Sequence, residues 1–230
     1  MHDIGKNDPA KFDDYAANYH TLVADNIALT GERPEYFANY KVECLQRLGV
    51  ERQAPLLDFG CDIGSLTSVL ISTFETVHGF DPSAKSVEVA QSRLPSVPMH
   101  SDLTKVPDAY FQTAVLSGVL HHISPSERDQ VLQSVFQKLA PGGRIVVFEH
   151  NPRNPLTRKA VETCPFDDDA ILLPASELIE RLVRAQFVET RLDYIVFFPK
   201  FLALLRPLEP HLSWLSLGAQ TMTIGVKPRG

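Results

Sequence analysis

Short apolar runs alternate with amphipathic stretches along most of this chain. The apolar runs lie near residues 55–60, 76–81, 98–101, 112–117 and 144–149, and apolar residues recur at helical spacing near 64–73, 83–94 and 125–140. Apolar runs bounded by turn residues are typical of buried parallel strands, whereas a period of 3.6 residues indicates helices that pack on one face. The pattern therefore predicts an α/β fold, with a doubly wound, mostly parallel sheet covered by helices on both faces.

The sequence predicts further helices and strands before the first of these strands and after the fifth. Apolar residues at helical spacing over 9–24, and a second such stretch over 34–48 that opens with a proline, predict two helices before the first strand. Beyond the fifth strand the pattern predicts a helix over 175–185, then strands over 187–196 and 221–226.

An apolar insert at residues 197–217 separates the last two predicted strands. Pro207 and Pro210 prevent it from forming one straight helix. Its large side chains need a partner, which we expect first within the protein itself, and otherwise in a second copy of the chain (a homodimer), an apolar substrate or a membrane surface. These side chains are Phe201, Leu205, Leu208, Leu212, Trp214 and Leu215.

The first strand leads into a glycine turn. Asp58 ends its apolar run, Gly60 and Gly64 follow, and a helical pattern begins directly after them. A strand, a tight turn and a helix N-terminus together let the backbone approach a nucleotide-like ligand closely. Asp81 ends the second strand, where a carboxylate can accept hydrogen bonds from both hydroxyls of a ribose. The turn alone also occurs in nicotinamide-binding proteins, so the pair of features carries the prediction.

These motifs resemble those of class I S-adenosylmethionine (SAM)-dependent methyltransferases. The first motif of that family reads approximately acid-x-Gly-x-Gly-x-Gly, and residues 58–64 follow it except that Asp62 replaces the middle glycine. Residues 101–103, 111–123 and 139–149 resemble the third, fourth and fifth strand regions, and the likeness runs roughly from residue 12 to 227. The resemblance implies a Rossmann-like sheet of seven strands with an antiparallel last strand.

The resemblance also implies a cofactor site built from several loops. Asp58, Gly60, Cys61 and Gly64 would form the turn beside the methionine part of SAM, with Ser117 bordering it. Asp81, followed by Pro82, would hold the ribose, and Asp102 with Leu103 the adenine. Tyr15 and Tyr19, in the N-terminal lid, either touch cofactor or substrate or pack as core residues. Asp62 would be repelled by the methionyl carboxylate unless it points away or contacts the amino group.

A histidine pair is the candidate catalytic group. His121 and His122 end the fourth strand, where this fold presents its substrate. Methyl transfer from a sulfonium mainly requires alignment, and a base is needed only when the acceptor must lose a proton, which histidine can take near neutral pH. The pair therefore suits a hydroxyl, an amine or an acidic carbon, although one histidine could simply pack against the next helix.

The loop after the fifth strand offers further polar candidates. Glu149, His150, Asn151 and Asn154 could face a substrate, or the asparagines could cap a helix that starts near Pro155. The acidic run at 167–169 is expected to be a solvated turn, because consecutive carboxylates rarely converge on one ion.

Composition narrows the function. The formal net charge of −6 and the lack of a basic cluster argue against a nucleic-acid partner and favour a small-molecule acceptor. The three cysteines, Cys44, Cys61 and Cys164, have no metal-ligand spacing, so no metal is expected and reduced thiols in the cytoplasm fit best. Neither a signal-peptide core nor a membrane-length apolar run appears in the sequence.

We therefore expect a SAM-dependent methyltransferase that modifies a small molecule, in a biosynthetic pathway. It would form a single domain over residues 1–230: a helical lid (1–50), a SAM-binding core (51–150) and a substrate-side half (151–230). Two alternatives remain. Asp62 motivates a non-catalytic methyltransferase-like subunit, and the sheet alone would allow a nicotinamide-dependent oxidoreductase, which should have a G-x-G-x-x-G turn near the N-terminus.

Overall fold

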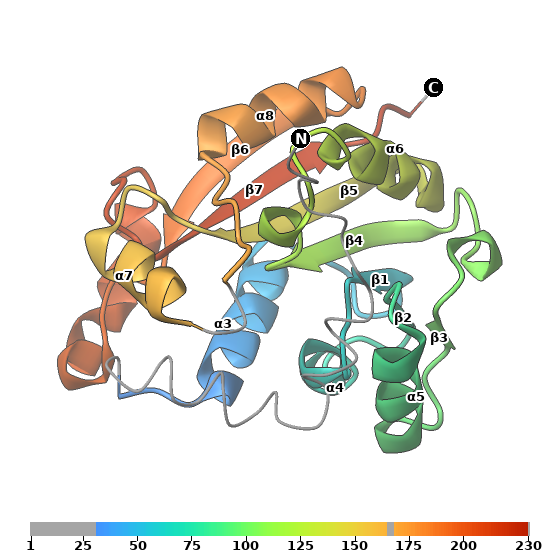
Figure 1. Ribbon diagram of the computed structural model, residues 1–230, viewed down its shortest axis with the longest axis horizontal. Coiled ribbons are helices and arrows are strands. Elements are labelled where there is room, and N and C mark those ends of the chain that lie inside the picture. Colours follow the sequence, from blue (N-terminus) through green and yellow to red (C-terminus); the bar gives the residue numbers. More distant parts are fainter. Residues whose placement is uncertain (1–30, 165–167, 230) are drawn as a thin grey trace, which may run out of the picture.

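A seven-stranded mixed sheet forms the centre of the protein (Figure 1). The computed structural model describes residues 31–164 and 168–229. The strand order is β3-β2-β1-β4-β5-β7-β6. The strands are β1 (Leu56–Phe59), β2 (Val77–Phe80), β3 (Met99–His100), β4 (Phe111–Ser117), β5 (Leu139–His150), β6 (Val188–Ile195) and β7 (Gln220–Val226).

The direction of the strands matches the predicted α/β fold. β1 to β5 pair in parallel, and β7 runs antiparallel between β5 and β6. The order of the parallel strands reverses between β1 and β4, and a crevice beyond the carboxyl ends of such a pair is where doubly wound sheets bind ligands. The predicted fold class, with its antiparallel last strand, is confirmed.

Helices cover both faces of the sheet (Figure 1). The α-helices are α3 (Pro34–Arg47), α4 (Ser65–Leu70), α5 (Ala84–Arg93), α6 (Arg128–Lys138), α7 (Pro155–Thr163) and α8 (Ala175–Arg184). The 3₁₀ segments within the described residues are η2 (Leu103–Lys105), η3 (Leu120–His122) and η5 (Lys200–Leu212). Within the described parts of the chain, none of these helices is long and apolar enough to cross a membrane.

Two apolar cores lie on the two faces. On one, Leu132 of α6 and Leu178 and Leu182 of α8 pack against inward-facing residues of β1, β4 and β5. On the other, Leu45 of α3 and Leu70 of α4 pack against the opposite side chains of the same strands. Strands that are buried on both faces read as continuous apolar runs, which is why the sequence pattern located them.

Local signals explain the helix ends. Pro34 opens α3, and the Ser83 hydroxyl accepts a hydrogen bond from the Ser86 N–H at the start of α5. β5 is longer than expected, because it begins at Leu139, which pairs with Phe111 before the register shifts ahead of the pairing of Thr113 with Arg144. The predicted helix over 9–24, and with it Tyr15 and Tyr19, lies outside the described residues, and the division of the chain into lid, core and substrate half stays a prediction.

Candidate functional site

The glycine turn links β1 to α4. Gly60 and Gly64 both have left-handed backbone angles, with φ of 81° and 80°. A side chain at Gly60 would have its Cβ 2.5 Å from a methyl group of Val119, the residue that leads into η3. Only glycine suits such a position, so the turn needs this residue both for its conformation and for close approach. The turn therefore lies directly against the loop that carries the histidine pair.

Asp81 directly follows β2 and lies beside the glycine turn. Its Oδ2 accepts a hydrogen bond from the Asp62 N–H at 2.9 Å, and its Oδ1 accepts one from the Ser83 N–H, also at 2.9 Å. Both oxygens of the carboxylate thus accept from backbone donors, and the residue is partly exposed. A carboxylate oxygen can accept more than one hydrogen bond, so Asp81 suits the hydroxyls of a ligand.

Asp62, which replaces the family's middle glycine, fits the turn. Its φ is 46°, a left-handed angle that aspartate tolerates better than most residues. Its Oδ1 accepts a hydrogen bond from the Ser86 hydroxyl at 3.1 Å, and Ser86 is a fully buried residue in the first turn of α5. The side chain therefore turns toward α5 and connects the glycine turn to that helix.

Asp58, at 1% exposure, lies beneath the turn. Burial raises its pKa to about 6, opposed by a 2.6 Å hydrogen bond from the Thr67 hydroxyl and by the charge of Lys41. Lys41, on α3, has its pKa lowered to about 8 by burial, while the charges of Asp58 and Glu149 raise it. Its ammonium also lies 5.9 Å from the centroid of the Phe148 ring. Lys41 thus supplies positive charge between two buried carboxylates.

The two histidines differ in their surroundings. His121 is 2% exposed, and its Nδ1 lies 2.6 Å from Oε2 of Glu149, the next-to-last residue of β5. Although burial opposes it, the charge of His121 and the hydrogen bond to it lower the pKa of Glu149 below the usual value. Glu149 therefore stays ionised, and the imidazole donates its Nδ1 proton to it.

His122 is slightly more exposed than His121, with 9% of its side chain exposed against 2%. Its Nδ1 lies 3.6 Å from Oδ1 of Asp169, a half-exposed carboxylate. The rings of His122 and His150 lie beside that of His121, at centroid distances of 4.1 and 5.1 Å. The structure therefore separates two residues that the sequence could not: His121 has a buried carboxylate partner and His122 an exposed one.

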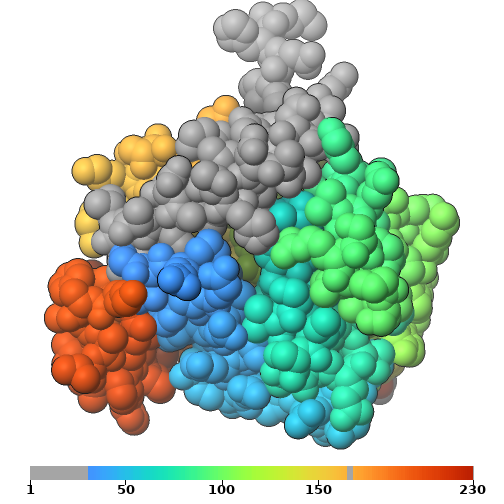
Figure 2. Space-filling model, turned by 90° about the horizontal axis from the view of Figure 1, so that it is seen from below, coloured from blue at the N-terminus to red at the C-terminus, as the bar shows by residue number. Residues whose placement is uncertain are grey.

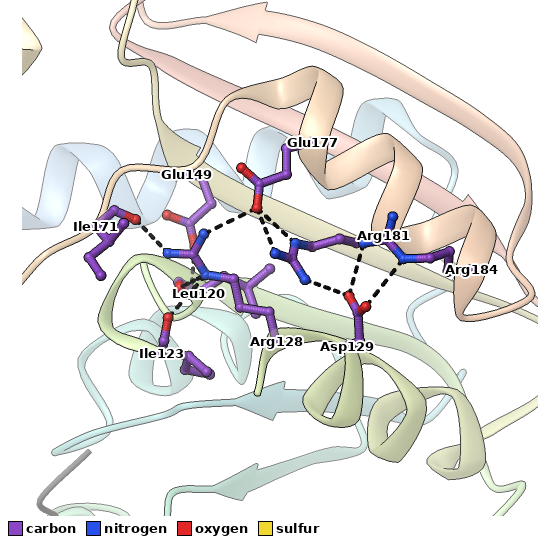
Figure 3. A network of polar contacts seen from close by, with 9 residues as sticks. All are labelled: Leu120, Ile123, Arg128, Asp129, Glu149, Ile171, Glu177, Arg181 and Arg184. Carbon is purple, nitrogen blue, oxygen red and sulfur yellow. Dashed lines mark hydrogen bonds and ion pairs between the residues drawn. The ribbon is translucent and has the colours of Figure 1, made fainter. Parts of the chain in front are cut away.

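A buried arginine holds the histidine loop in place (Figure 3). Arg128, the first residue of α6, is 1% exposed and donates from Nε to the carbonyl oxygens of Leu120 and Ile123 at 2.9 and 3.0 Å. Its Nη2 donates to the Ile171 carbonyl at 2.6 Å. Glu149 accepts a further hydrogen bond from the Leu120 N–H at 2.7 Å, on the oxygen that His121 does not use. η3 is thus fixed from both sides.

The remaining predicted positions lie along the same edge of the sheet. Ser117 ends β4, Cys61 is buried in the glycine turn, and Pro82 is exposed directly after Asp81. Asp102 is exposed and caps η2 by accepting from the backbone and hydroxyl of Thr104, which lowers its pKa. Leu103 packs at the edge of one apolar core. In the described residues no group of three or more His, Cys, Asp or Glu side chains could hold a metal ion.

The structure bears out the capping alternative for Asn154, which accepts hydrogen bonds from the Leu156 and Thr157 N–H groups and caps α7. Asn151 donates to the Ser216 and Gly218 carbonyls. Lys41 was not predicted from the sequence. The available signal was a lysine on the apolar face of a helix, at helical spacing from Phe37 and Leu45.

Comparisons with known proteins agree with this architecture. Residues 57–147 match the family model described as a methyltransferase domain. An uncharacterized methyltransferase of Bacillus cytotoxicus is 31% identical over 139 residues, which are 59% of this chain and 63% of that protein. An uncharacterized methyltransferase of Oceanobacillus iheyensis is 28% identical over 141 residues, with the same two coverages. The chain thus spans less than two thirds of the relatives it matches.

Solved structures extend the likeness to nearly the whole fold. A SAM-dependent methyltransferase of Thermotoga maritima, titled a possible histamine N-methyltransferase, has a TM-score of 0.66 at 18% identity, covering 95% of this chain and 98% of that one. Phosphoethanolamine N-methyltransferase 2 of Haemonchus contortus, solved with SAM, has a TM-score of 0.59 at 18% identity, covering 83% of this chain and 52% of that one. At these identities the structures establish the fold alone.

Proposed function

We propose that the chain is a class I SAM-dependent methyltransferase that methylates a small molecule at a hydroxyl, an amine or an acidic carbon. The observation that carries this proposal is the His121–Glu149 pair, which lies beside a glycine turn at the carboxyl edge of the sheet. A buried histidine held by a carboxylate is the arrangement of a general base, and only a reaction that removes a proton needs one.

The residues around the turn suit the cofactor. The left-handed angles of Gly60 and Gly64 keep the turn tight, which lets its backbone approach the methionine part of SAM. Asp81 would hold the ribose through its two carboxylate oxygens, and Asp58 and Lys41 offer opposite charges for the amino and carboxylate groups. When bound, SAM supplies the methyl group and its own leaving group. The protein therefore has to align the acceptor and remove its proton.

We assign the base to His121 in preference to His122. Glu149 accepts the Nδ1 proton of His121, so the neutral ring keeps its lone pair on Nε2 and can take a proton there. As that proton arrives, the ionised Glu149 stabilises the imidazolium. His122 would serve as a neighbour that shapes the acceptor side, because its partner, Asp169, is half-exposed and lies at 3.6 Å.

A small acceptor fits the charge of the chain. The net charge of −6 would repel a polyanion such as a nucleic acid. A place in a biosynthetic pathway remains part of this proposal. The rival proposal, a non-catalytic subunit, is motivated by Asp62, and the Ser86 hydrogen bond gives that residue a structural role within the protein.

The test is a screen with methyl-labelled SAM against panels of hydroxylated, amino-bearing and acidic-carbon metabolites. We expect label transfer to one class, lost in His121→Ala and retained in His122→Ala to within about tenfold. SAM binding should be the same in all three proteins. Binding of SAM without label transfer to any class would favour the non-catalytic alternative, and equal losses in both variants would contradict the assignment of the base to His121.

A further inference from the structure

The insert between β6 and β7 turns its apolar side chains outward. η5 bends at Leu202, whose backbone angles are not helical, and beyond the bend residues three apart share one face, because a 3₁₀-helix has three residues per turn. Leu204 is 96% exposed and shares its face with Pro207 and Pro210, and Phe201, before the bend, is 80% exposed. Leu205 and Leu208, on the next face, are 39% and 52% exposed. The expectation that this segment packs internally is therefore wrong for these side chains.

Two polar side chains of η5, those of Arg206 and Glu209, face the body of the protein and fix this orientation. Glu209 is 3% exposed and accepts hydrogen bonds from the Tyr40 hydroxyl at 2.6 Å and from the Phe197 and Phe198 N–H groups at 3.0 and 2.9 Å. Arg206 pairs with Glu32, and its guanidinium lies 4.2 Å from the centroid of the Tyr36 ring. The segment is thus anchored against α3, where Figure 2 shows it beside that helix.

The exposed apolar residues continue onto α7. Trp214, Leu217 and Leu156 are 75%, 58% and 78% exposed. The Asn154 side chain donates to the Leu217 carbonyl at 2.7 Å, so the start of α7 and the end of the insert are neighbours. We call this set the apolar–basic surface. Its exposed apolar members are Phe201, Leu204, Leu205, Leu208, Trp214, Leu217 and Leu156, and its exposed basic members are Arg153, Arg158, Lys159, Lys200 and His211.

The charge of this surface is opposite to that of the whole chain. Glu209 is the single carboxylate within residues 197–217, and it is buried, while residues 150–161 contain no acidic side chain. The nearest exposed acid on α7 is Glu162, in its last turn. A chain with a net charge of −6 therefore gathers positive charge around its largest exposed apolar side chains.

The apolar–basic surface lies on the same edge of the sheet as the candidate site. His150 of β5 pairs with Gln220 of β7, which in turn pairs with Ile195 of β6. The end of β5, the start of β7 and the end of β6 therefore meet in one row. The insert begins just after the end of β6 in this row. Glu149, of the candidate site, directly precedes His150 on β5.

We propose that the apolar–basic surface docks the protein on the anionic face of a lipid bilayer. Leucine and aromatic side chains flanked by lysine and arginine are what an interfacial site requires, since apolar burial and attraction to anionic headgroups add together. A second copy of the chain fits less well, because a two-fold interface would bring the same basic residues against each other. Docking in this way would present the candidate site to the bilayer surface.

The single tryptophan of the chain, Trp214, makes a direct probe of this proposal. Vesicles of phosphatidylcholine with phosphatidylglycerol should sediment the protein and shift its tryptophan emission to shorter wavelength. Vesicles of phosphatidylcholine alone should do so much more weakly, and added salt should reduce binding. An emission spectrum that does not change on adding anionic vesicles would overturn the proposal.

Paired variants then separate this surface from the rest of the molecule. Leu204→Ser should weaken vesicle binding at least about tenfold, and Lys200→Gln about fivefold. The matched controls are Val183→Ser, at 57% exposure on α8, and Lys85→Gln on α5, which should bind as the unaltered protein does. Thermal unfolding should be unchanged in all four, because the altered side chains are exposed. Equal losses in test and control variants, or a dimer that Leu204→Ser dissociates without any effect on vesicle binding, would contradict the proposal.

Discussion

Replacing Glu149 by glutamine isolates the role proposed for the His121–Glu149 pair. Glutamine has nearly the same shape, so packing around this 2% exposed residue should persist. Glu149 accepts from two donors on different oxygens: the Leu120 N–H on Oε1 at 2.7 Å and the His121 ring on Oε2 at 2.6 Å. A glutamine side chain has one oxygen and one NH₂ group, so it can accept from only one of the two.

The consequence falls on the histidine ring. If the amide oxygen keeps the Leu120 N–H, its NH₂ group faces His121 Nδ1, which must then become the acceptor and move the ring proton to Nε2. A base that carries its proton on Nε2 cannot take another there, and the charge that stabilises the imidazolium is also lost. General-base catalysis contributes typically 10²–10⁴-fold, so we expect kcat to fall by about that factor in Glu149→Gln.

The assay compares methyl transfer and cofactor binding in the same preparations. Label transfer from SAM to the acceptor gives kcat, and calorimetry gives the SAM affinity, which should stay within about threefold because neither residue is assigned to the cofactor. His122→Asn is the matched control and should retain most of the rate. A Glu149→Gln protein that keeps near-full kcat on a true acceptor would refute the reasoning and make the pair a structural element.

Three further predictions concern the turn. Asp81→Ala should weaken SAM binding by roughly 2–4 kcal/mol, measured by calorimetry, because charge-assisted hydrogen bonds to the ribose are lost; unchanged affinity would remove Asp81 from that role. Asp62→Gly should leave SAM affinity unchanged or improve it, since φ of 46° suits glycine and the carboxylate turns toward Ser86; a tenfold loss would make Asp62 a cofactor contact. Burial raises the pKa of Asp58 from 3.8 to about 6, so the folded state holds this proton more tightly than the unfolded chain does. The protonated Asp58 stabilises the folded state fully below pH 3.8, and this contribution is lost as the pH rises to about 6. Over that window, unfolding titrations should show the free energy of unfolding of the wild type falling by up to about 3 kcal/mol relative to that of Asp58→Asn. A flat difference would contradict the raised pKa.

Most of the sheet could be predicted because its strands are buried on both faces. β1 and β4 have apolar side chains in both directions and end at glycine or polar turns, and such runs have few other interpretations. The early start of β5 could not be read from the sequence, because the pairing of Leu139 with Phe111 depends on a neighbouring strand. The outward orientation of η5 was also hidden. Its apolar residues are continuous over residues 201–205, so no period marks a face, and the burial of Glu209 shows which side points inward.

The sequence could predict which strand ends form the candidate site. It could not predict which side chains contact one another there. Asp58 and Asp81 lie at fixed distances along the sequence from the glycine turn, so a motif identifies them. The choice between His121 and His122 depends on Glu149, which is 28 residues away and reaches the ring through the pairing of β4 with β5. Lys41 approaches from α3, a helix that no motif connects to the turn.

The most direct test of the account is a calorimetric titration of the purified protein with SAM, with its demethylated product S-adenosylhomocysteine, and with NAD. We predict one-to-one binding of SAM and its product in the low-micromolar range or weaker, with no binding of NAD. Asp81→Ala, titrated alongside, should lose most of the SAM affinity. Binding of NAD without SAM, or of neither, would contradict the assignment of this turn and its second-strand carboxylate to SAM.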